Sequence, residues 1–231
     1  MKTNYTYKYP RPAITVDNVM LGYADGALKI LLVHRTNEPY SGKWALPGGF
    51  LHEGESLSDC SVRILKEKVG LENPFMEQLY TFGAPDRDPR EHIVSVTYFI
   101  LINHFPVVEN ISEKVDQVAW FLWNELPDLA FDHAAIIRVA LDRIRAKIRY
   151  SPLAFELLPE KFTLSQLQTL FEVILHQTMD RRNFRKKLLS MDILNELEET
   201  TTKKVGKPAV LYAFDQKKYD ALLQQQIYFE L

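Results

Sequence analysis

The chain has 231 residues and a mass of 26.9 kDa, enough for one domain of average size and a smaller second one. Hydrophobic residues make up 46% of it and charged residues 25%, which excludes a disordered or collagen-like chain. The 28 Lys and Arg nearly balance the 30 Asp and Glu, so net charge neither supports nor excludes a nucleic-acid partner.

Cysteine, histidine and apolar runs limit the compartment and the cofactors. The single cysteine, Cys60, excludes an internal disulfide and suits the reducing cytosol. The N-terminus carries no apolar signal segment, and no run approaches the roughly 18 apolar residues of a membrane span. The histidines show no short pair or cluster with metal-ligand spacing. We therefore expect a cytoplasmic protein with no membrane contact, no metal and no cofactor.

Residues 1–150 begin with strand signals. Two runs rich in β-branched and apolar residues, 13–23 and 28–35, flank Ala24, Asp25 and Gly26, which predicts a hairpin. Two later runs predict buried strands because they are rich in apolar and β-branched residues. These runs are residues 93–102 and 118–123.

Two helices are predicted in the same part of the chain. Ser56, with Asp59 three residues further on, resembles a capping box, and Gly70 gives the stop signal of the first helix. An apolar stripe with helical spacing between Asp132 and Ile148 predicts the second, which closes the first domain.

The chain changes character after residue 150. Residues 151–159 contain two prolines and are predicted to be a linker, although an apolar one that should pack. In residues 160–231, apolar spacing predicts helices at 164–175 and 181–190, and a lysine-rich loop precedes a strand at 210–214. Two short helices followed by a hairpin with a basic tip are typical of a winged helix-turn-helix domain.

The most specific motif of the chain lies between residues 49 and 71. It resembles the Nudix box, G-x5-E-x7-R-E-U-x-E-E-x-G-U with U aliphatic, preceded by the LPGG that is usual in that family. The matching positions are Gly49, Glu55, Arg63, Leu65, Glu67, Gly70 and Leu71. The resemblance implies an α+β Nudix fold over about residues 10–150, with a mixed sheet between helices, followed here by the small winged helix-turn-helix domain.

The box lacks most of the carboxylates that its chemistry requires. The resemblance implies three glutamates on one helix face that gather Mg²⁺ or Mn²⁺ near a pyrophosphate, but this chain has Ile64, Glu67 and Lys68 there. At about 5 Å and an effective dielectric of about 20, the Lys68 ammonium would repel a dication by roughly 6–7 kcal/mol. We therefore expect no catalytic residue and no enzyme activity, with Arg63 paired to Glu67 and Ile64 in apolar packing.

An enzyme remains the main alternative interpretation. If ligands elsewhere in the chain supplied the missing carboxylates, the domain would be a Mg²⁺-dependent hydrolase of ADP-ribose or a related nucleoside diphosphate derivative. Release of product in the presence of Mg²⁺ would distinguish this enzyme from a regulator.

Positive charge is concentrated in the second domain. The cations of the second predicted helix are Arg181, Arg182, Arg185, Lys186 and Lys187, and those of the predicted wing tip are Lys203, Lys204 and Lys207. Such a run usually forms a solvated helix face, and an acidic protein could also bind it. Combined with the helix-turn-helix pattern it predicts DNA binding, with Arg182 and Asn183 at base edges and the other cations on phosphates.

Nearly the whole chain resembles the Nudix-related transcriptional regulators of the NrtR and AraR kind. The segments that carry the resemblance are Phe82-Gly83, Asp86-Arg87-Asp88-Pro89, Phe131-Asp132-His133, Phe162-Thr163-Leu164, Gln166-Leu167-Gln168, the run from Asp180 to Lys186, and Leu211-Tyr212. The resemblance implies a homodimeric regulator that binds double-stranded operator DNA and a small-molecule effector. The losses at Ile64 and Lys68 fit the sugar-sensing branch better than the ADP-ribose-sensing branch, so the expected effector is a pentose such as L-arabinose.

The former catalytic cleft is the expected effector pocket. Its candidate residues are Arg35, Glu38, Trp44 and Gly48 along the cleft, and Asp86, Arg87, Asp88 and Arg90 in the loop after the box. Carboxylates and guanidinium groups can satisfy the hydroxyls of a sugar, and an aromatic ring can stack on it. The alternative interpretations are a salt-bridged turn at residues 86–90 and core packing of Trp44.

Overall fold

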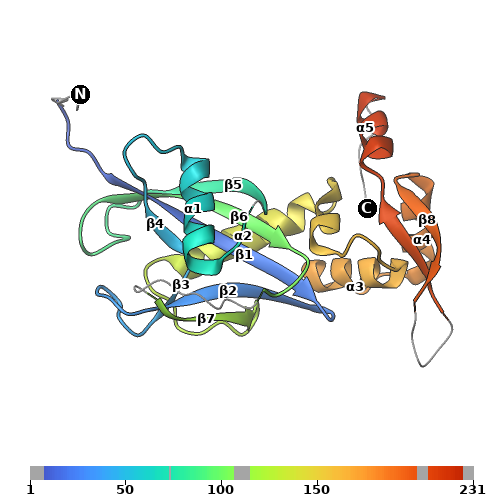
Figure 1. The fold of residues 1–231 in the computed structure, drawn as a ribbon, viewed down its shortest axis with the longest axis horizontal. Helices are drawn as coiled ribbons and strands as arrows, with labels where there is room; N and C mark the ends of the chain where they lie inside the picture. Colours follow the sequence, from blue (N-terminus) through green and yellow to red (C-terminus); the bar gives the residue numbers. More distant parts are fainter. Residues whose placement is uncertain (1–7, 73, 107–114, 202–207, 226–231) are drawn as a thin grey trace.

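The computed structural model describes residues 8–72, 74–106, 115–201 and 208–225, which form a large domain built on a sheet and a smaller helical domain (Figure 1). The strands of the large domain are β1 (Ala13–Ala24), β2 (Ala27–Arg35), β3 (Trp44–Ala45), β4 (Gly48–Phe50), β5 (Phe75–Phe82), β6 (Ile93–Ile102) and β7 (Val115–Leu122). Their order is β3-β2-β1-β6-β5, with β4 paired to β1 and β7 paired to β2. Because β1 and β6 run parallel and the other pairs antiparallel, the sheet is mixed, as predicted.

The predicted hairpin joins β1 to β2 through a turn of two residues. Asp25 and Gly26 have φ angles of 52° and 76°. Positive φ at both turn positions matches the twist of the flanking strands. Ala24, which was predicted to lie in the turn, instead ends β1 and pairs with Ala27.

One helix covers each face of the sheet (Figure 1). Helix α1 (Leu57–Val69) begins where the Ser56 hydroxyl accepts the Asp59 N–H, 3.1 Å away, and ends at Gly70, whose φ of 69° is left-handed. Helix α2 (His133–Lys147) packs on the opposite face. Both helices lie where the sequence predicts them.

The second domain has the helix order expected for a winged helix. Its elements are a 3-10 helix η1 (Pro152–Leu157), α3 (Leu164–Leu175), α4 (Arg181–Ser190), β8 (Leu194–Thr200), β9 (Val210–Phe214) and α5 (Gln216–Gln224). Strands β8 and β9 form the hairpin, and Phe162 adds a bridge to Tyr212, with N–H···O distances of 2.9 and 2.8 Å. The sequence pattern did not predict helix α5, and it predicted a linker in place of η1.

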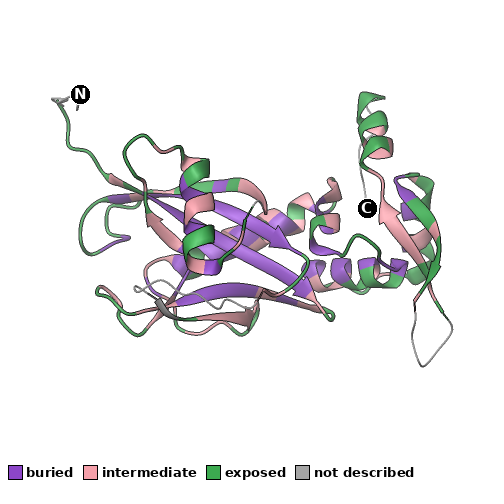
Figure 2. Ribbon diagram, viewed as in Figure 1, coloured by how far each residue is buried: buried purple, intermediate pink, exposed green. Residues whose placement is uncertain are grey.

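A continuous apolar core joins the two domains. Figure 2 shows buried residues along the sheet and also on the side of α3 that meets the first domain. Leu153 and Leu157 of η1 are buried in the same cluster as Ile144 of α2 and Leu167 of α3. The segment predicted to be a linker is therefore part of the core.

Polar contacts also cross between the domains. The centre of the Trp123 ring lies 4.5 Å from the centre of the His176 ring, at the end of α3. The Arg145 guanidinium carbon lies 5.3 Å from the centre of the Trp123 ring. Arg145 Nε also donates a 3.2 Å hydrogen bond to the carbonyl of Ile174. Within the described residues, no helix is long and apolar enough to cross a membrane.

Candidate functional site

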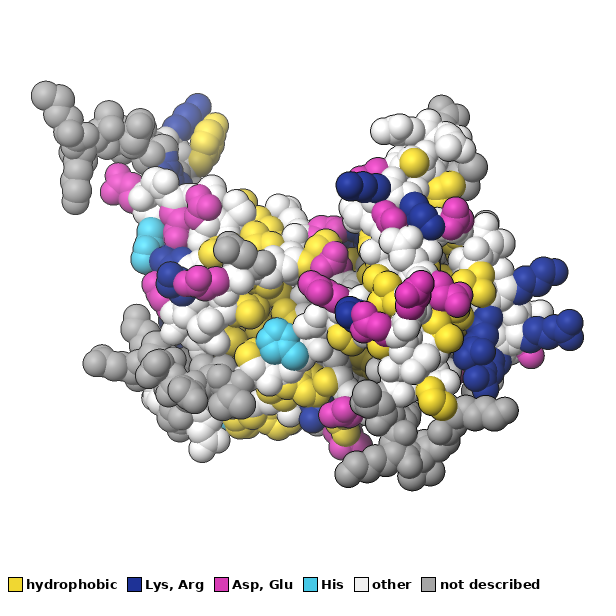
Figure 3. Space-filling view, turned by 45° about the vertical axis from the view of Figure 1, so that its right-hand side comes forward, with side chains coloured by type: hydrophobic (Ala, Val, Ile, Leu, Met, Phe, Trp, Pro, Cys, Tyr) yellow, Lys and Arg dark blue, Asp and Glu magenta, His cyan; other side chains and the backbone are white. Residues whose placement is uncertain are grey.

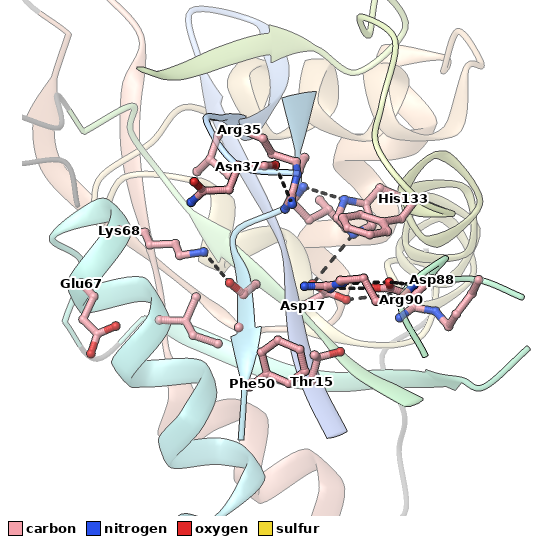
Figure 4. A pocket seen from close by; sticks show the side chains of 18 of the residues that line it. Thr15, Asp17, Arg35, Asn37, Phe50, Glu67, Lys68, Asp88, Arg90 and His133 are labelled. Carbon is pink, nitrogen blue, oxygen red and sulfur yellow. Dashed lines mark hydrogen bonds and ion pairs between the residues drawn. The ribbon is translucent and has the colours of Figure 1, made fainter. Parts of the chain in front are cut away.

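A cavity of about 690 Å³ opens beside α1, bounded by residues of β1 to β4, the loop between β5 and β6, and the start of α2 (Figure 4). Its size is typical of small-molecule sites. The predicted residues that line it are Arg35, Glu38, Gly48, Gly49, Arg63, Glu67, Arg87, Asp88 and Arg90. The structure thus brings most of the predicted effector residues and part of the box into one cavity.

A buried carboxylate, Asp17 of β1, forms the floor of the cavity. It is 6% exposed and accepts a short hydrogen bond from the Ser95 hydroxyl. Arg87 Nη2 lies 3.7 Å and His133 Nε2 lies 3.9 Å from its oxygens. A Cβ at Gly48 would lie 1.9 Å from Asp17 Oδ1, so only glycine leaves room for the carboxylate.

The hydrogen bonds of His133 fix the position of its proton. Its Nδ1 accepts the N–H of Leu46 at 2.9 Å, so the neutral ring carries its proton on Nε2, which faces Asp17. Burial lowers the pKa of His133, although Asp17 and Asp132 act in the opposite direction. The cavity therefore contains a neutral imidazole that can donate from Nε2.

The loop between β5 and β6 forms the salt-bridged turn that was the alternative to effector binding for residues 86–90. Arg90 donates to both oxygens of Asp88, at 2.9 and 2.6 Å. Arg87 makes a bidentate pair with Asp132, at 3.0 and 2.7 Å. Because these side chains also line the cavity, the two interpretations of the loop are compatible.

Two guanidinium groups lie over aromatic rings at the cavity. Arg35 is 4.8 Å from the centre of the Phe131 ring, and Arg90 is 5.4 Å from that of Phe50. Arg35 also donates to the carbonyl of Pro39 at 3.0 Å. Phe50 is 41% exposed, so its ring remains available for stacking.

The box arginine binds two carboxylates. Arg63 pairs with Glu67 at 3.3 Å, as predicted, but its shorter contacts are to Glu55, at 2.7 and 3.0 Å. The hydrogen bond from Arg63 lowers the pKa of Glu55 to about 2. Ile64 is 1% exposed, which confirms its predicted apolar packing. These box residues therefore hold α1 against the preceding loop.

The box does not fit a divalent cation. Lys68 Nζ donates a hydrogen bond to the Gly48 carbonyl, which brings an ammonium group to the cavity wall (Figure 4). Across the described ranges, no group of three or more His, Cys, Asp or Glu side chains could hold a metal ion. With Ile64 apolar and Glu67 bound to Arg63, the helix face offers one carboxylate that is already paired.

Two predicted effector residues lie outside the cavity. Trp44 packs edge-on against His34 and Phe121, with ring centres 5.1 and 4.7 Å apart, so its core-packing interpretation holds. Because side chains alternate along a strand, Ala45 rather than Trp44 faces the cavity. Asp86 is exposed in the loop and is not part of the lining.

The lining residues that were not among the predicted site residues include Asp17, Phe50 and Phe131. Asp17 had a usable signal, because it is a charged residue inside a long apolar strand run. Phe131 was noted as part of a family motif without a role in the pocket. Nothing in the spacing of Phe50 indicates an exposed ring beside Arg90.

Helix α4 presents a basic face (Figure 3). Its exposed predicted DNA-binding residues are Arg181, Arg182, Asn183, Lys186 and Lys187. Phe184 and Leu188 are buried on the other side of the helix. Arg185 is half-buried and donates to the Ser165 hydroxyl of α3 at 3.2 Å, which turns it away from the exposed row. The wing-tip lysines, Lys203, Lys204 and Lys207, lie outside the described residues.

Comparison with known proteins matches both domains. The model of the NUDIX domain matches residues 12–142, and that of the NrtR DNA-binding winged helix domain matches residues 154–214. The "ADPR responsive transcriptional repressor NtrR" of Acinetobacter baylyi is 37% identical over 217 residues, covering 92% of this chain and 86% of that protein.

Two solved structures of Shewanella oneidensis NrtR extend the comparison. NrtR complexed with a 27mer DNA has a TM-score of 0.76 and 36% identity, covering 89% of this chain and 94% of that one. The NUDIX domain of NrtR complexed with ADP ribose has a TM-score of 0.56 and 39% identity, covering 61% of this chain and 94% of that one.

A Nudix domain joined to a winged-helix DNA-binding domain defines a class, the Nudix-related transcriptional regulators. Within that class, the chain belongs to the NrtR family. The relatives reported above are described with ADP-ribose or DNA, and none with a free pentose. The expectation of a sugar-sensing regulator is therefore not supported.

Proposed function

We propose that this protein is a homodimeric transcriptional repressor whose binding to operator DNA responds to ADP-ribose in the cavity. The observation that carries the effector is the set of cations in the cavity, where Arg35 and Arg90 lie over aromatic rings and Lys68 is part of the lining. ADP-ribose has an anionic diphosphate between an adenosine and a ribose, which such a cavity complements.

The lining offers a partner for each part of ADP-ribose. A guanidinium group can donate to phosphate oxygens, and Arg35, whose hydrogen bonds go to the carbonyls of Pro39 and Asn37, is the candidate for that contact. The exposed ring of Phe50 can stack on the adenine. Asp88 can accept hydrogen bonds from ribose hydroxyls. The relatives that respond to or bind ADP-ribose support this assignment.

DNA contact is assigned to α4 and the wing. The exposed cations of α4 suit phosphates, and Arg182 and Asn183, in its first turn, suit base edges in the major groove. The complex of the relative NrtR with a 27mer DNA supports DNA binding as such. The wing lysines remain predicted contacts.

We also infer that the cavity does not hydrolyse its ligand. A metal-assisted attack on the diphosphate needs carboxylates to hold the cation, and Ile64 and Lys68 remove two of them. If chromatography after incubation of the protein with ADP-ribose and Mg²⁺ showed AMP and ribose phosphate forming catalytically, this inference would be wrong.

The experiment that tests the regulator selects bound duplexes from a random DNA pool. Fluorescence anisotropy on the selected duplex is then repeated with ADP-ribose, AMP or L-arabinose. We expect ADP-ribose to change the apparent Kd of the duplex by about 5- to 150-fold, the usual range of coupling between two sites. If L-arabinose changed the apparent Kd and ADP-ribose did not, the assignment of ADP-ribose as the effector would be wrong. If no sequence were enriched, the assignment of DNA binding would be wrong.

A further inference from the structure

We propose that the Lys68 ammonium is a resident cation that takes over the role of the box metal, so that this protein binds the diphosphate of ADP-ribose without a divalent ion. The proposal rests on the proposed function and deepens it, because it concerns how the same cavity holds its ligand. It follows from a disagreement between the residues of the box and the metal that the Nudix fold implies.

The position of the ammonium is the first step. Lys68 stands in the last turn of α1 and is half-buried, and its Nζ donates to the carbonyl of Gly48 in β4. This bond ties a positive charge to the wall of the cavity (Figure 4). An ammonium carries three N–H donors, so one group can hold a carbonyl and phosphate oxygens together.

The neighbours of Lys68 exclude a dication from the same place. Ile64 fills its side of the helix with an apolar group, and Glu67 is paired with Arg63. A divalent ion there would meet one paired carboxylate and a fixed positive charge a few ångströms away. A ligand with two phosphates is attracted to the same place, because its negative charge complements the ammonium of Lys68.

The three arginines considered next, which also line the cavity, differ in the groups that accept their hydrogen bonds. Arg87 and Arg90 each make a bidentate ion pair with an aspartate, whereas Arg35 donates its hydrogen bonds to the carbonyls of Asn37 and Pro39. A diphosphate bound between α1 and β2 would therefore meet Lys68 on one element and Arg35 on the other. This pair supplies two positive charges, which is the charge of the ion they replace.

Titration calorimetry of the full chain with ADP-ribose, in EDTA and again in Mg²⁺, tests the proposal. We expect the wild-type chain to have the same affinity in both buffers. Lys68→Met should lower the affinity about 10- to 100-fold in both, as the loss of a charge-assisted hydrogen bond does. Lys68→Glu should bind weakly in EDTA and regain affinity when Mg²⁺ is added, because a second carboxylate then adjoins Glu67.

Lys66→Met is the matched control, since Lys66 lies on the same helix and pairs at the exposed surface with Glu72 at 2.7 Å. It should bind like the wild type. A wild-type chain that binds only in Mg²⁺, or a folded Lys68→Met that binds normally, would overturn the role of Lys68 and leave the ADP-ribose assignment intact. Wild-type protein that binds ADP-ribose in neither buffer would overturn the proposed function itself. The comparison of buffers needs no variant, so a folding defect in one variant cannot hide the result.

Discussion

Gly48 links the fold to the cavity, because the space where its side chain would lie holds the carboxylate of Asp17. Asp17 has a short side chain and is held by Ser95, so it cannot move far. We expect Gly48→Ala to lower the free energy of unfolding by about 1–3 kcal/mol, the usual cost of overpacking, and to weaken ADP-ribose binding. Urea denaturation and calorimetry measure the two effects.

Gly83→Ala is the control for that substitution. A Cβ there would meet Val94 at 3.6 Å, an ordinary contact, and so should change neither quantity much. If the two variants were equally stable, the close approach of Gly48 to Asp17 would not be a constraint on the fold.

Glu55 makes stability depend on pH. Its folded pKa is about 2 because Arg63 binds the ionised carboxylate, and the unfolded value is about 4.3. The stabilisation is therefore fully present above the unfolded pKa and is lost as pH falls through that value toward the folded pKa. We expect the difference in unfolding free energy between wild type and Glu55→Gln to shrink from pH 5 to pH 3. Urea melts at a series of pH values measure this difference.

At the residue scale, the sequence predicts contacts that are local and misses those that depend on the sheet. The Arg63–Glu67 pair and the burial of Ile64 follow from helical spacing. The Asp17–Ser95 contact joins residues 78 positions apart through the parallel pairing of β1 and β6, and no local pattern encodes it. Whether the Trp44 side chain points into the cavity or away from it depends on which face of the two-residue strand β3 it occupies, and the sequence does not define that face.

At the element scale, helices α3 and α4 begin and end where the sequence predicts because their signals are local. Thr163 and Gln166 form a complete capping box at α3, and the Asp180 carboxylate accepts the N–H of Asn183 at 2.8 Å to start α4. Strand β5 and helix α5 were not predicted. Strand β5 buries one residue and helix α5 none, so neither carries the long apolar run that marks a core element.

The first turn and the middle of α4 should affect DNA binding differently. With about four phosphates neutralised per protomer, log affinity of the dimer should fall with log[salt] at a slope near −7. Lys186→Ala should weaken all sequences about equally and reduce that slope by about 2 per dimer. Asn183→Ala should instead reduce discrimination between sequences by about 1–3 kcal/mol per site. Salt titrations on the selected and random duplexes measure both effects.

Lys217→Ala is the control because it removes an exposed lysine from a different helix, α5. It should leave the salt slope unchanged. If Lys186→Ala also left the slope unchanged, α4 would not be the phosphate-binding helix.

At the scale of the whole molecule, the contact between Trp123, Arg145 and His176 connects the large domain to the end of α3. We expect Trp123→Ala to reduce the effect of ADP-ribose on DNA affinity while ADP-ribose binding itself stays near the wild-type value. Anisotropy on the selected duplex and calorimetry measure the two separately. Tyr150→Ala, which removes a 55% exposed ring near the junction, should preserve both. An unchanged response in Trp123→Ala would show that the signal takes another route.

The shared apolar core of Leu157, Leu167 and Ile144 has a consequence for the lifetime of the protein. Because the core is continuous, the two domains should unfold in one transition, and a ligand of one domain then protects both. At a concentration 100 times its Kd, ADP-ribose would add about 2.7 kcal/mol to the stability of the whole chain. Limited proteolysis in the turn between α3 and α4 should therefore slow when ADP-ribose is added, although that turn is far along the chain from the cavity. With ADP-ribose as the proposed effector of DNA binding, the same metabolite would in this way also control how long the regulator survives.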